Sequence, residues 1–164
     1  SMGGILTLTA ASYLPVKGLV TMSTPYQLPD DPRLRHIEWI SKFAPYMPKG
    51  NEEPGSTWFD KEAFKTHVSY PQNPLHAIGE LNKLIGVMQA SLPKVTAPIL
   101  LIHSRDDHYV LEDSLPRLYE QVGSTHKQML WIEGSGHVIT RDAQRETVFK
   151  AAAEFIHNLE RGAG

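Results

Sequence analysis

The sequence predicts an α/β fold in which a parallel sheet is flanked by helices and interrupted by a mainly helical insertion. Short apolar runs alternate with longer segments of helical periodicity, an order that is typical of parallel sheets. The strand-like runs are apolar almost throughout, as expected for strands that are buried on both faces. The chain has 164 residues, of which 41% are hydrophobic, and this suffices for one domain with a hydrophobic core.

The N-terminal segment predicts a helix followed by a strand. Residues 4–14 are apolar with several small side chains, and Pro15 ends this run. Residues 16–23 are mostly apolar and β-branched and end at Thr24-Pro25, which is the pattern of a short buried strand. A helix followed closely by such a strand is half of a βαβ unit.

The middle segment, residues 26–94, differs in composition from the rest. It is rich in proline and in polar linkers, and it contains two of the three tryptophans. Apolar residues at helical spacing predict a short helix near residues 34–43 and a longer one over residues 78–92. We therefore predict that residues 26–94 form an inserted cap, and that residues 1–25 and 95–164 form the core.

The C-terminal segment returns to alternating strands and helices. Residues 98–104 and 128–133 predict two buried strands, and residues 111–122 predict the helix between them. Residues 141–161 predict a final helix, because their apolar side chains recur on one stripe. The predicted order is helix, strand, cap, strand, helix, strand, helix.

Acidic and histidine side chains lie in the loops that follow the second and third predicted strands. Asp106 and Asp107 come after residues 98–104, and His137 comes after residues 128–133. Ligands of parallel sheets bind beyond the carboxyl ends of the strands, so we expect these loops to meet at one functional edge. A carboxylate that orients a histidine, which in turn takes a proton from a serine, is the arrangement of Ser-His-Asp hydrolases. Considered singly, each of these side chains has a more ordinary role as a turn cap or as polar surface.

The serine of such a system is predicted at residue 1. Ser1-Met2-Gly3-Gly4 precedes a predicted helix and matches the second half of the nucleophile elbow, G-x-S-x-G. The sharp turn of this elbow needs a small residue two places after the nucleophile, where a Cβ would clash, and Gly3 supplies it. The N-terminus of a helix favours a developing oxyanion, so we expect the Met2 amide to donate one hydrogen bond to it.

These motifs together resemble a known family. Residues 1–4, 18–22, 104–110 and 134–140 are similar to the carboxylesterase and monoacylglycerol-lipase branch of the α/β-hydrolases, and most of all to small bacterial thermostable carboxylesterases. The resemblance extends over the full chain, though loosely through the predicted cap. Its most specific part is the run SGHVIT at residues 135–140. The implied fold is an α/β-hydrolase fold.

The resemblance implies an enzyme that hydrolyses esters of short or medium acyl chains, or monoacylglycerols, through an acyl-serine intermediate. Ser1 would be the nucleophile, His137 the general base and Asp107 the acid. The D-x-x-V spacing to Val110 selects Asp107 over Asp106. No cofactor or metal ion is implied, and the expected partner is a small-molecule ester or lipid substrate. Apolar side chains of the cap would pack against one another or line an acyl pocket, and the candidates are Ile37, Trp39, Ile40, Phe43, Met47 and Met88.

An enzyme of this type has strands, helices and an oxyanion loop before its nucleophile. We therefore expect that activity requires an N-terminal part of the fold, and that residues 1–164 alone are nearly inactive, since losing one oxyanion donor costs about 10²–10³ in rate. Two alternatives for Ser1 stay open. It could be the remnant of an expression tag, or it could be an N-terminal nucleophile that uses its own amine as the base. Two alternative functions also stay open, namely amide or peptide cleavage and a non-catalytic interaction module.

Composition argues against several functional classes. The net charge is −2 without a basic cluster, so nothing indicates binding to nucleic acid. The chain has no cysteine, which excludes disulfides and thiolate sites and fits a cytoplasmic protein. No apolar run approaches the ~20 residues of a transmembrane segment. Four further histidines lack the spacing of metal ligands, so they give no indication of a metal site. They are His36, His67, His76 and His103.

Overall fold

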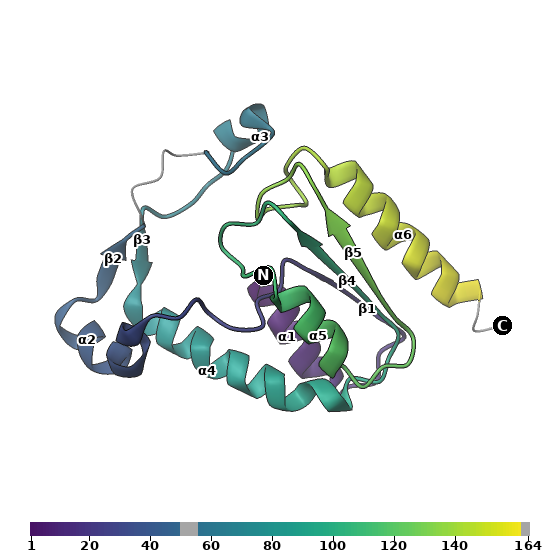
Figure 1. The fold of residues 1–164 in the computed structure, drawn as a ribbon, viewed down its shortest axis with the longest axis horizontal. Coiled ribbons are helices and arrows are strands. Elements are labelled where there is room, and N and C mark those ends of the chain that lie inside the picture. The colour runs from purple at the N-terminus through teal and green to yellow at the C-terminus, as the bar shows by residue number, and fades with distance from the viewer. Residues whose placement is uncertain (50–55, 162–164) are drawn as a thin grey trace.

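The computed structural model describes residues 1–49 and 56–161 and contains a parallel sheet (Figure 1). Its strands are β1 (Leu19–Met22), β4 (Ile99–Ser104) and β5 (Lys127–Ile132), in the order β1-β4-β5. β1 pairs in parallel with β4, and β4 pairs in parallel with β5. The carboxyl ends of all three strands therefore meet at one edge, and the predicted α/β class is confirmed.

Helices cover both faces of this sheet. α1 (Met2–Ala11), α4 (Leu75–Ser91) and α5 (Ser114–Gln121) contribute to the apolar cluster on one face. α6 (Arg145–Arg161) packs on the other face (Figure 1). The sheet is thus the middle layer of three.

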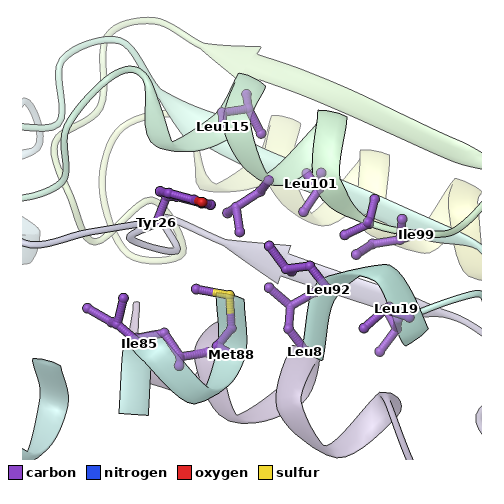
Figure 2. Close-up of a cluster of buried hydrophobic side chains, with 13 residues drawn as sticks. Leu8, Leu19, Tyr26, Ile85, Met88, Leu92, Ile99, Leu101 and Leu115 are labelled. Atoms are coloured by element: carbon purple, nitrogen blue, oxygen red, sulfur yellow. The ribbon is translucent and has the colours of Figure 1, made fainter. Parts of the chain in front are cut away.

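β4 lies at the centre of the hydrophobic core and is buried along its whole length. Successive side chains of a strand point to opposite faces, so Leu101 joins the cluster with α1, α4 and α5, while Ile102 joins the cluster with α6. Figure 2 shows the first cluster, in which Leu8, Met88 and Leu115 from the three helices meet the sheet. The continuous apolar pattern of the predicted strand reflects this two-sided burial.

The predicted helices and strands occur, but several of their ends are shifted. The first strand ends at Met22 because Ser23 has a left-handed backbone with φ of 47°, which an extended strand cannot continue. The last helix begins at Arg145 and not near residue 141, because residues 138–142 are closed by turn hydrogen bonds.

Between β1 and β4 the chain forms short elements and one long helix. The elements that precede α4 are the 3₁₀ helix η1 (Pro32–His36), α2 (Ile37–Phe43), β2 (Tyr46–Pro48), α3 (Lys61–Lys65) and β3 (Gln72–Pro74), and η2 (Leu92–Lys94) follows it. β2 and β3 form an antiparallel pair that the sequence did not predict. Strands of three residues are too short to show a period-2 pattern.

Helix α4 connects these short elements with the core. Its N-terminal half packs on α2, where a Cβ on Gly79 would lie 3.0 Å from Ile37 Cγ2. Its C-terminal half packs on α1 and buries Ile85 and Met88 in the core. Figure 1 accordingly shows α2 and the β2–β3 pair at the N-terminal end of α4.

The division into a core at residues 1–25 and 95–164 and a cap at residues 26–94 stays a prediction. Residues 50–55 of the predicted cap and residues 162–164 of the predicted core lie outside the described residues. In the described part of the chain, no helix is both long and apolar enough to cross a membrane.

Candidate active site

Asp107 is the centre of a buried polar cluster in the loop that follows β4. Its side chain has no exposed surface. One carboxylate oxygen, Oδ1, accepts hydrogen bonds from the main-chain N–H groups of Tyr109 (2.9 Å) and Val110 (3.0 Å). The other oxygen, Oδ2, lies 2.8 Å from His137 Nδ1. The D-x-x-V turn therefore fixes one oxygen and directs the other toward the histidine.

The surroundings of Asp107 keep this side chain ionised. Burial alone would raise the pKa of the carboxyl, but the imidazoles of His103 and His137 outweigh burial and hold the pKa well below its ordinary range. His103 is buried on β4, stacks on Trp131 and places Nε2 3.4 Å from Asp107 Oδ2. This nitrogen has no hydrogen-bond partner among the described residues, so its contact with Asp107 is electrostatic.

His137 lies in the loop that follows β5, with 19% of its side chain exposed. Because Nδ1 is the atom beside the Asp107 carboxylate, we assign the proton to Nδ1, and Nε2 is left as an acceptor. The Tyr109 ring lies 5.5 Å from the imidazole, centroid to centroid. In this tautomer the imidazole can take a proton at Nε2 while the carboxylate stabilises the resulting cation.

Ser1 lies at the carboxyl end of β1. It is the N-cap residue of α1, but its hydroxyl does not cap the helix. Its backbone nitrogen donates a hydrogen bond to the Met22 carbonyl oxygen (2.5 Å), and the next residue, Ser23, donates its hydroxyl to the main-chain oxygen of His137 (2.9 Å). Ser1 and the His137 loop are thus both hydrogen-bonded to residues at the carboxyl end of β1. Among the described residues, no hydrogen bond joins the Ser1 hydroxyl to His137.

The first turn of α1 contains Met2, the predicted oxyanion donor, and its closest approach to another element is not at Gly3. Met2 is the first helical residue, where main-chain N–H groups have no partner within the helix. A Cβ on Gly3 would meet no described heavy atom within 4 Å, whereas a Cβ on Gly4 would lie 1.9 Å from Thr24 Oγ1. The close approach that requires glycine is therefore at residue 4, where α1 crosses the end of β1.

Asp106 has a different partner from Asp107. Its Oδ2 accepts a hydrogen bond from the main-chain N–H of Gly134 (2.7 Å). Gly134 has φ of +75°, a backbone conformation that favours glycine. Asp106 therefore joins the loop after β4 to the loop after β5, and Asp107 is the carboxylate that faces His137.

Three further side chains support the His137 loop, and the sequence did not single them out. They are Ser23, Ser104, whose hydroxyl donates to the main-chain oxygen of Ser135, and Asp142, which accepts from a main-chain N–H of the loop. Ser23 and Ser104 lie at the carboxyl ends of β1 and β4, where functional side chains of parallel sheets are expected, so strand position could have indicated them. Asp142 does not follow a strand, and no sequence pattern indicated it.

The apolar side chains of the predicted cap do not share one environment. A cavity of about 270 Å³ lies between α2, β2 and the start of α4, and three of the six candidates line it: Ile37, Ile40 and Met47. Trp39 and Phe43 are exposed, and Met88 lies in the hydrophobic core, so a pocket role for Met88 is wrong. α2 and β2 lie apart from the N-terminus in Figure 1.

In the described part of the chain, no three His, Cys, Asp or Glu side chains are grouped so that they could hold a metal ion.

Comparison with known families identifies the chain. The family described as serine aminopeptidase, S33, matches residues 1–144, which is most of the sequence. The chain belongs to this family. The match includes Ser1, Asp107 and His137.

Curated relatives of this S33-family chain include two Bacillus enzymes. It is 27% identical over 162 residues to a carboxylesterase of Bacillus subtilis, and 26% identical over 161 residues to a thermostable monoacylglycerol lipase of Bacillus sp. strain H-257. These alignments cover 98% and 95% of the chain, but 62% and 60% of the relatives. The chain therefore spans about three fifths of the length of these relatives.

Solved structures of similar fold include lipolytic enzymes. A chain from the study of LipS and LipT, two metagenome-derived lipolytic enzymes, superposes with a TM-score of 0.81 at 29% identity. The superposed region covers 96% of the S33-family chain and 62% of the LipS/LipT-study chain. The monoacylglycerol lipase of Paleococcus ferrophilus gives a TM-score of 0.80 at 18% identity over 97% of the chain and 66% of its own length, which shows the fold alone. The α/β-hydrolase fold and the resemblance to the carboxylesterase and monoacylglycerol-lipase branch are confirmed.

Proposed function

We propose that this chain carries the nucleophile, acid and base of a serine hydrolase that cleaves carboxylic esters. The observation that carries the proposal is the 2.8 Å contact between Asp107 and His137 at the sheet edge where Ser1 also lies. The Bacillus relatives support the substrate class, which we propose to be esters of short or medium acyl chains or monoacylglycerols.

In the proposed acylation step, His137 Nε2 takes the proton of the Ser1 hydroxyl as the oxygen attacks the ester carbonyl carbon. The carbonyl oxygen becomes an oxyanion at the N-terminus of α1, where the Met2 N–H donates to it. The imidazolium, stabilised by ionised Asp107, then protonates the leaving alcohol as the ester C–O bond breaks. The product of this step is an ester of Ser1.

In the proposed deacylation step, His137 Nε2 takes a proton from water, whose oxygen attacks the acyl carbon. The bond to Ser1 breaks, and the same proton returns to the serine oxygen. The acid is released and the enzyme regains its first state. Both steps use the Nε2 atom that the Nδ1 contact with Asp107 leaves as an acceptor.

We propose that a second oxyanion donor comes from the part of the relatives' fold that this chain does not span. The proposal predicts that residues 1–164 alone have little activity, because one missing donor costs about 10²–10³ in rate. The assays below therefore use the natural polypeptide that contains this chain, with residues 1–164 measured alongside.

The decisive test combines p-nitrophenyl ester hydrolysis with labelling by a fluorophosphonate. Ser1→Ala should abolish labelling, and both Ser1→Ala and His137→Gln should lower kcat by about 10⁴-fold or more. Ser12→Ala and His157→Gln are matched controls outside the site and should retain activity. Labelling that persists in Ser1→Ala, or full activity in His137→Gln, would contradict the proposed mechanism. A protein that is neither labelled nor active would favour a non-catalytic role.

The family description supports amide or peptide cleavage as a second candidate function. An acyl-serine mechanism serves amides as well as esters, so the Asp107–His137 pair is compatible with both. Comparing kcat/KM for a p-nitrophenyl ester and for aminoacyl p-nitroanilides would separate them. A higher kcat/KM for the anilides would replace the esterase proposal.

A further inference from the structure

Asp142 is a buried carboxylate that binds the main chain of two distant segments. It has no exposed surface. Its Oδ2 accepts a hydrogen bond from Gly136 N–H (2.7 Å), which is adjacent to His137 in the chain. Its Oδ1 accepts from Phe59 N–H (3.0 Å) and Asp60 N–H (2.6 Å), which lie before α3. A fourth N–H, that of Ala143, also donates to Oδ1 (2.8 Å).

Burial makes these hydrogen bonds mutually dependent. A buried carboxylate is costly unless hydrogen bonds replace its lost hydration, and N–H bonds to an ionised oxygen are stronger than neutral ones. Removing the Phe59 and Asp60 donors would leave Asp142 Oδ1 with the Ala143 N–H alone. The segment before α3 and the loop that carries His137 are therefore stabilised together.

Two close contacts on either side of Asp142 strengthen the same junction. A Cβ on Gly136 would lie 2.1 Å from the carbonyl oxygen of Thr57, so the two backbones approach as closely as glycine permits. Arg145 at the start of α6 donates to Asp60 Oδ2 (2.7 Å). Figure 1 shows α3 beside the loop that joins β5 to α6.

We propose that Asp142 is a positioning residue that sets the main chain of the His137 loop and makes this setting depend on the segment 57–60. The inference rests on the proposed function for its catalytic consequence, and on the described contacts for its structural part. His137 must keep Nδ1 beside Asp107 while Nε2 serves Ser1, and a shift of its loop would disturb both contacts. The segment 57–60, which lies within the predicted cap, thereby influences the orientation of the general base without touching it.

The test uses Asp142→Asn in the natural polypeptide that contains this chain. The amide keeps the shape of the side chain but has one acceptor oxygen, so it can serve Gly136 or the Phe59–Asp60 pair and not both. Amide hydrogen exchange should accelerate together at residues 59–60 and 136–137, and the NMR chemical shifts of the His137 ring should change. Asp113→Asn, an exposed change of the same charge at the start of α5, is the control and should alter neither.

A kinetic measurement tests the catalytic consequence. kcat for the p-nitrophenyl ester should fall by about ten- to a hundred-fold with little change in KM, the scale of a misplacement of about 1 Å. Gly136→Ala leaves the carboxylate in place but displaces Thr57, and should show the same split between kcat and KM.

The outcomes separate the two proposals. Unchanged chemical shifts of the His137 ring, or exchange that accelerates in one segment alone, would overturn the inference whatever the activity. If Asp142→Asn does not fold, wild-type exchange decides, because the amides of Phe59, Asp60 and Gly136 must then be protected to a similar degree. Coupled exchange in a protein that is not labelled at Ser1 would retain the coupling and contradict the proposed function.

Discussion

Asp106 and Asp107 are adjacent in the chain but hold different partners. Asp106 binds the Gly134 N–H and joins two loops, whereas Asp107 faces His137. Both carboxylates are needed for one geometry, because the first holds the loop and the second holds the imidazole. Which of them faces the imidazole is decided by the direction of the side chain and not by its charge.

Replacing Asp107 by Asn should lower kcat by about 10⁴-fold, because an amide can neither fix the correct imidazole tautomer nor stabilise the imidazolium. Asp106→Asn is the matched control and should cost less than about tenfold, since the amide oxygen can still accept from Gly134. Steady-state kinetics with a p-nitrophenyl ester measures both. Equal losses in the two variants would contradict the assignment of the acid.

Ionised Asp107 also makes stability depend on pH. Its folded-state pKa is lower than the ordinary value of about 4, so its contribution to the free energy of unfolding is fully present above about pH 4 and is lost as the pH falls through the folded-state pKa. Asp107→Asn lacks this titration. Wild type should therefore lose stability relative to the variant only below about pH 4, as urea unfolding at a series of pH values would measure. Parallel curves over the whole range would refute this linkage.

Sequence reasoning at the residue scale selected Asp107 and His137 because strand ends and chain order carry a pattern. It did not select Ser23 or Asp142, which act by binding main-chain groups. Any residue offers a main-chain N–H or C=O, so the partner leaves no mark in the sequence. The expected clash at Gly3 has no partner among the described residues, and the close contact is instead at Gly4, whose neighbour Thr24 belongs to another element.

Among the elements, α4 packs on α2 at its N-terminal end and on α1 at its C-terminal end. Met88 is 0% exposed in the core, and its neighbour Val87 is 53% exposed. Met88→Ala should lower the free energy of unfolding by about 2–5 kcal/mol, because it removes apolar contact and leaves a cavity. Val87→Ala should change it by about 0.5 kcal/mol or less. Urea unfolding provides both values, and a small effect at Met88 would mean that α4 does not pack on α1 as described.

Two glycines in α4 provide a second test of its surroundings. A Cβ on Gly86 would meet no described heavy atom within 4 Å, so Gly86→Ala should stabilise the helix by about 0.5–1 kcal/mol. Gly79→Ala should gain less, because its Cβ would lie 3.0 Å from Ile37 Cγ2. Thermal or urea unfolding can rank them. The reverse order would show that α2 does not lie against Gly79.

Predictability at the element scale depended on length. β4, α4 and α6 are long enough for burial or periodicity to be visible in the sequence, and they lie close to the predicted ranges. β2, β3 and α3 span three to five residues and were not predicted. Their formation depends on partners, since Tyr46–Pro48 pairs with residues 72–74 across a long separation in the chain.

At the scale of the whole molecule, the sheet ends in two different edges. In the described ranges, β1 and β5 each pair with β4 alone. β5 begins with Lys127 and Gln128, polar residues that discourage pairing with another chain, whereas β1 consists of Leu19, Val20, Thr21 and Met22. The edge of β1 is the one that invites a further strand.

Residues 1–164 alone should therefore self-associate through the edge of β1. Sedimentation velocity at increasing concentration should show a rising weight-average mass, whereas a polypeptide in which another strand pairs with β1 should stay monomeric. Amide exchange on β1 should slow as the concentration rises. A chain that is monomeric at all concentrations would contradict this role of the β1 edge.

The sequence predicted the layers of the molecule but not their long-range contacts. Parallel strands and the meeting of the Asp107 and His137 loops follow from the order of elements. The contact of residues 57–60 with residues 136–145 does not, because it joins segments about 80 residues apart in the chain through main-chain hydrogen bonds.

The contact of Asp142 with main-chain donors has a consequence for how the protein can evolve. Phe59 and Asp60 donate backbone N–H groups, so proline is the one ordinary substitution at these positions that deletes a donor. Mutations can therefore accumulate at residue 59 while the backbone keeps its course, whereas the Asp60 side chain also binds Arg145. The side chain of Phe59 can therefore change while the main-chain contacts that link this segment to the His137 loop stay in place. Position 142 has no such freedom, and descendants of this chain should vary at residue 59 long before they vary there.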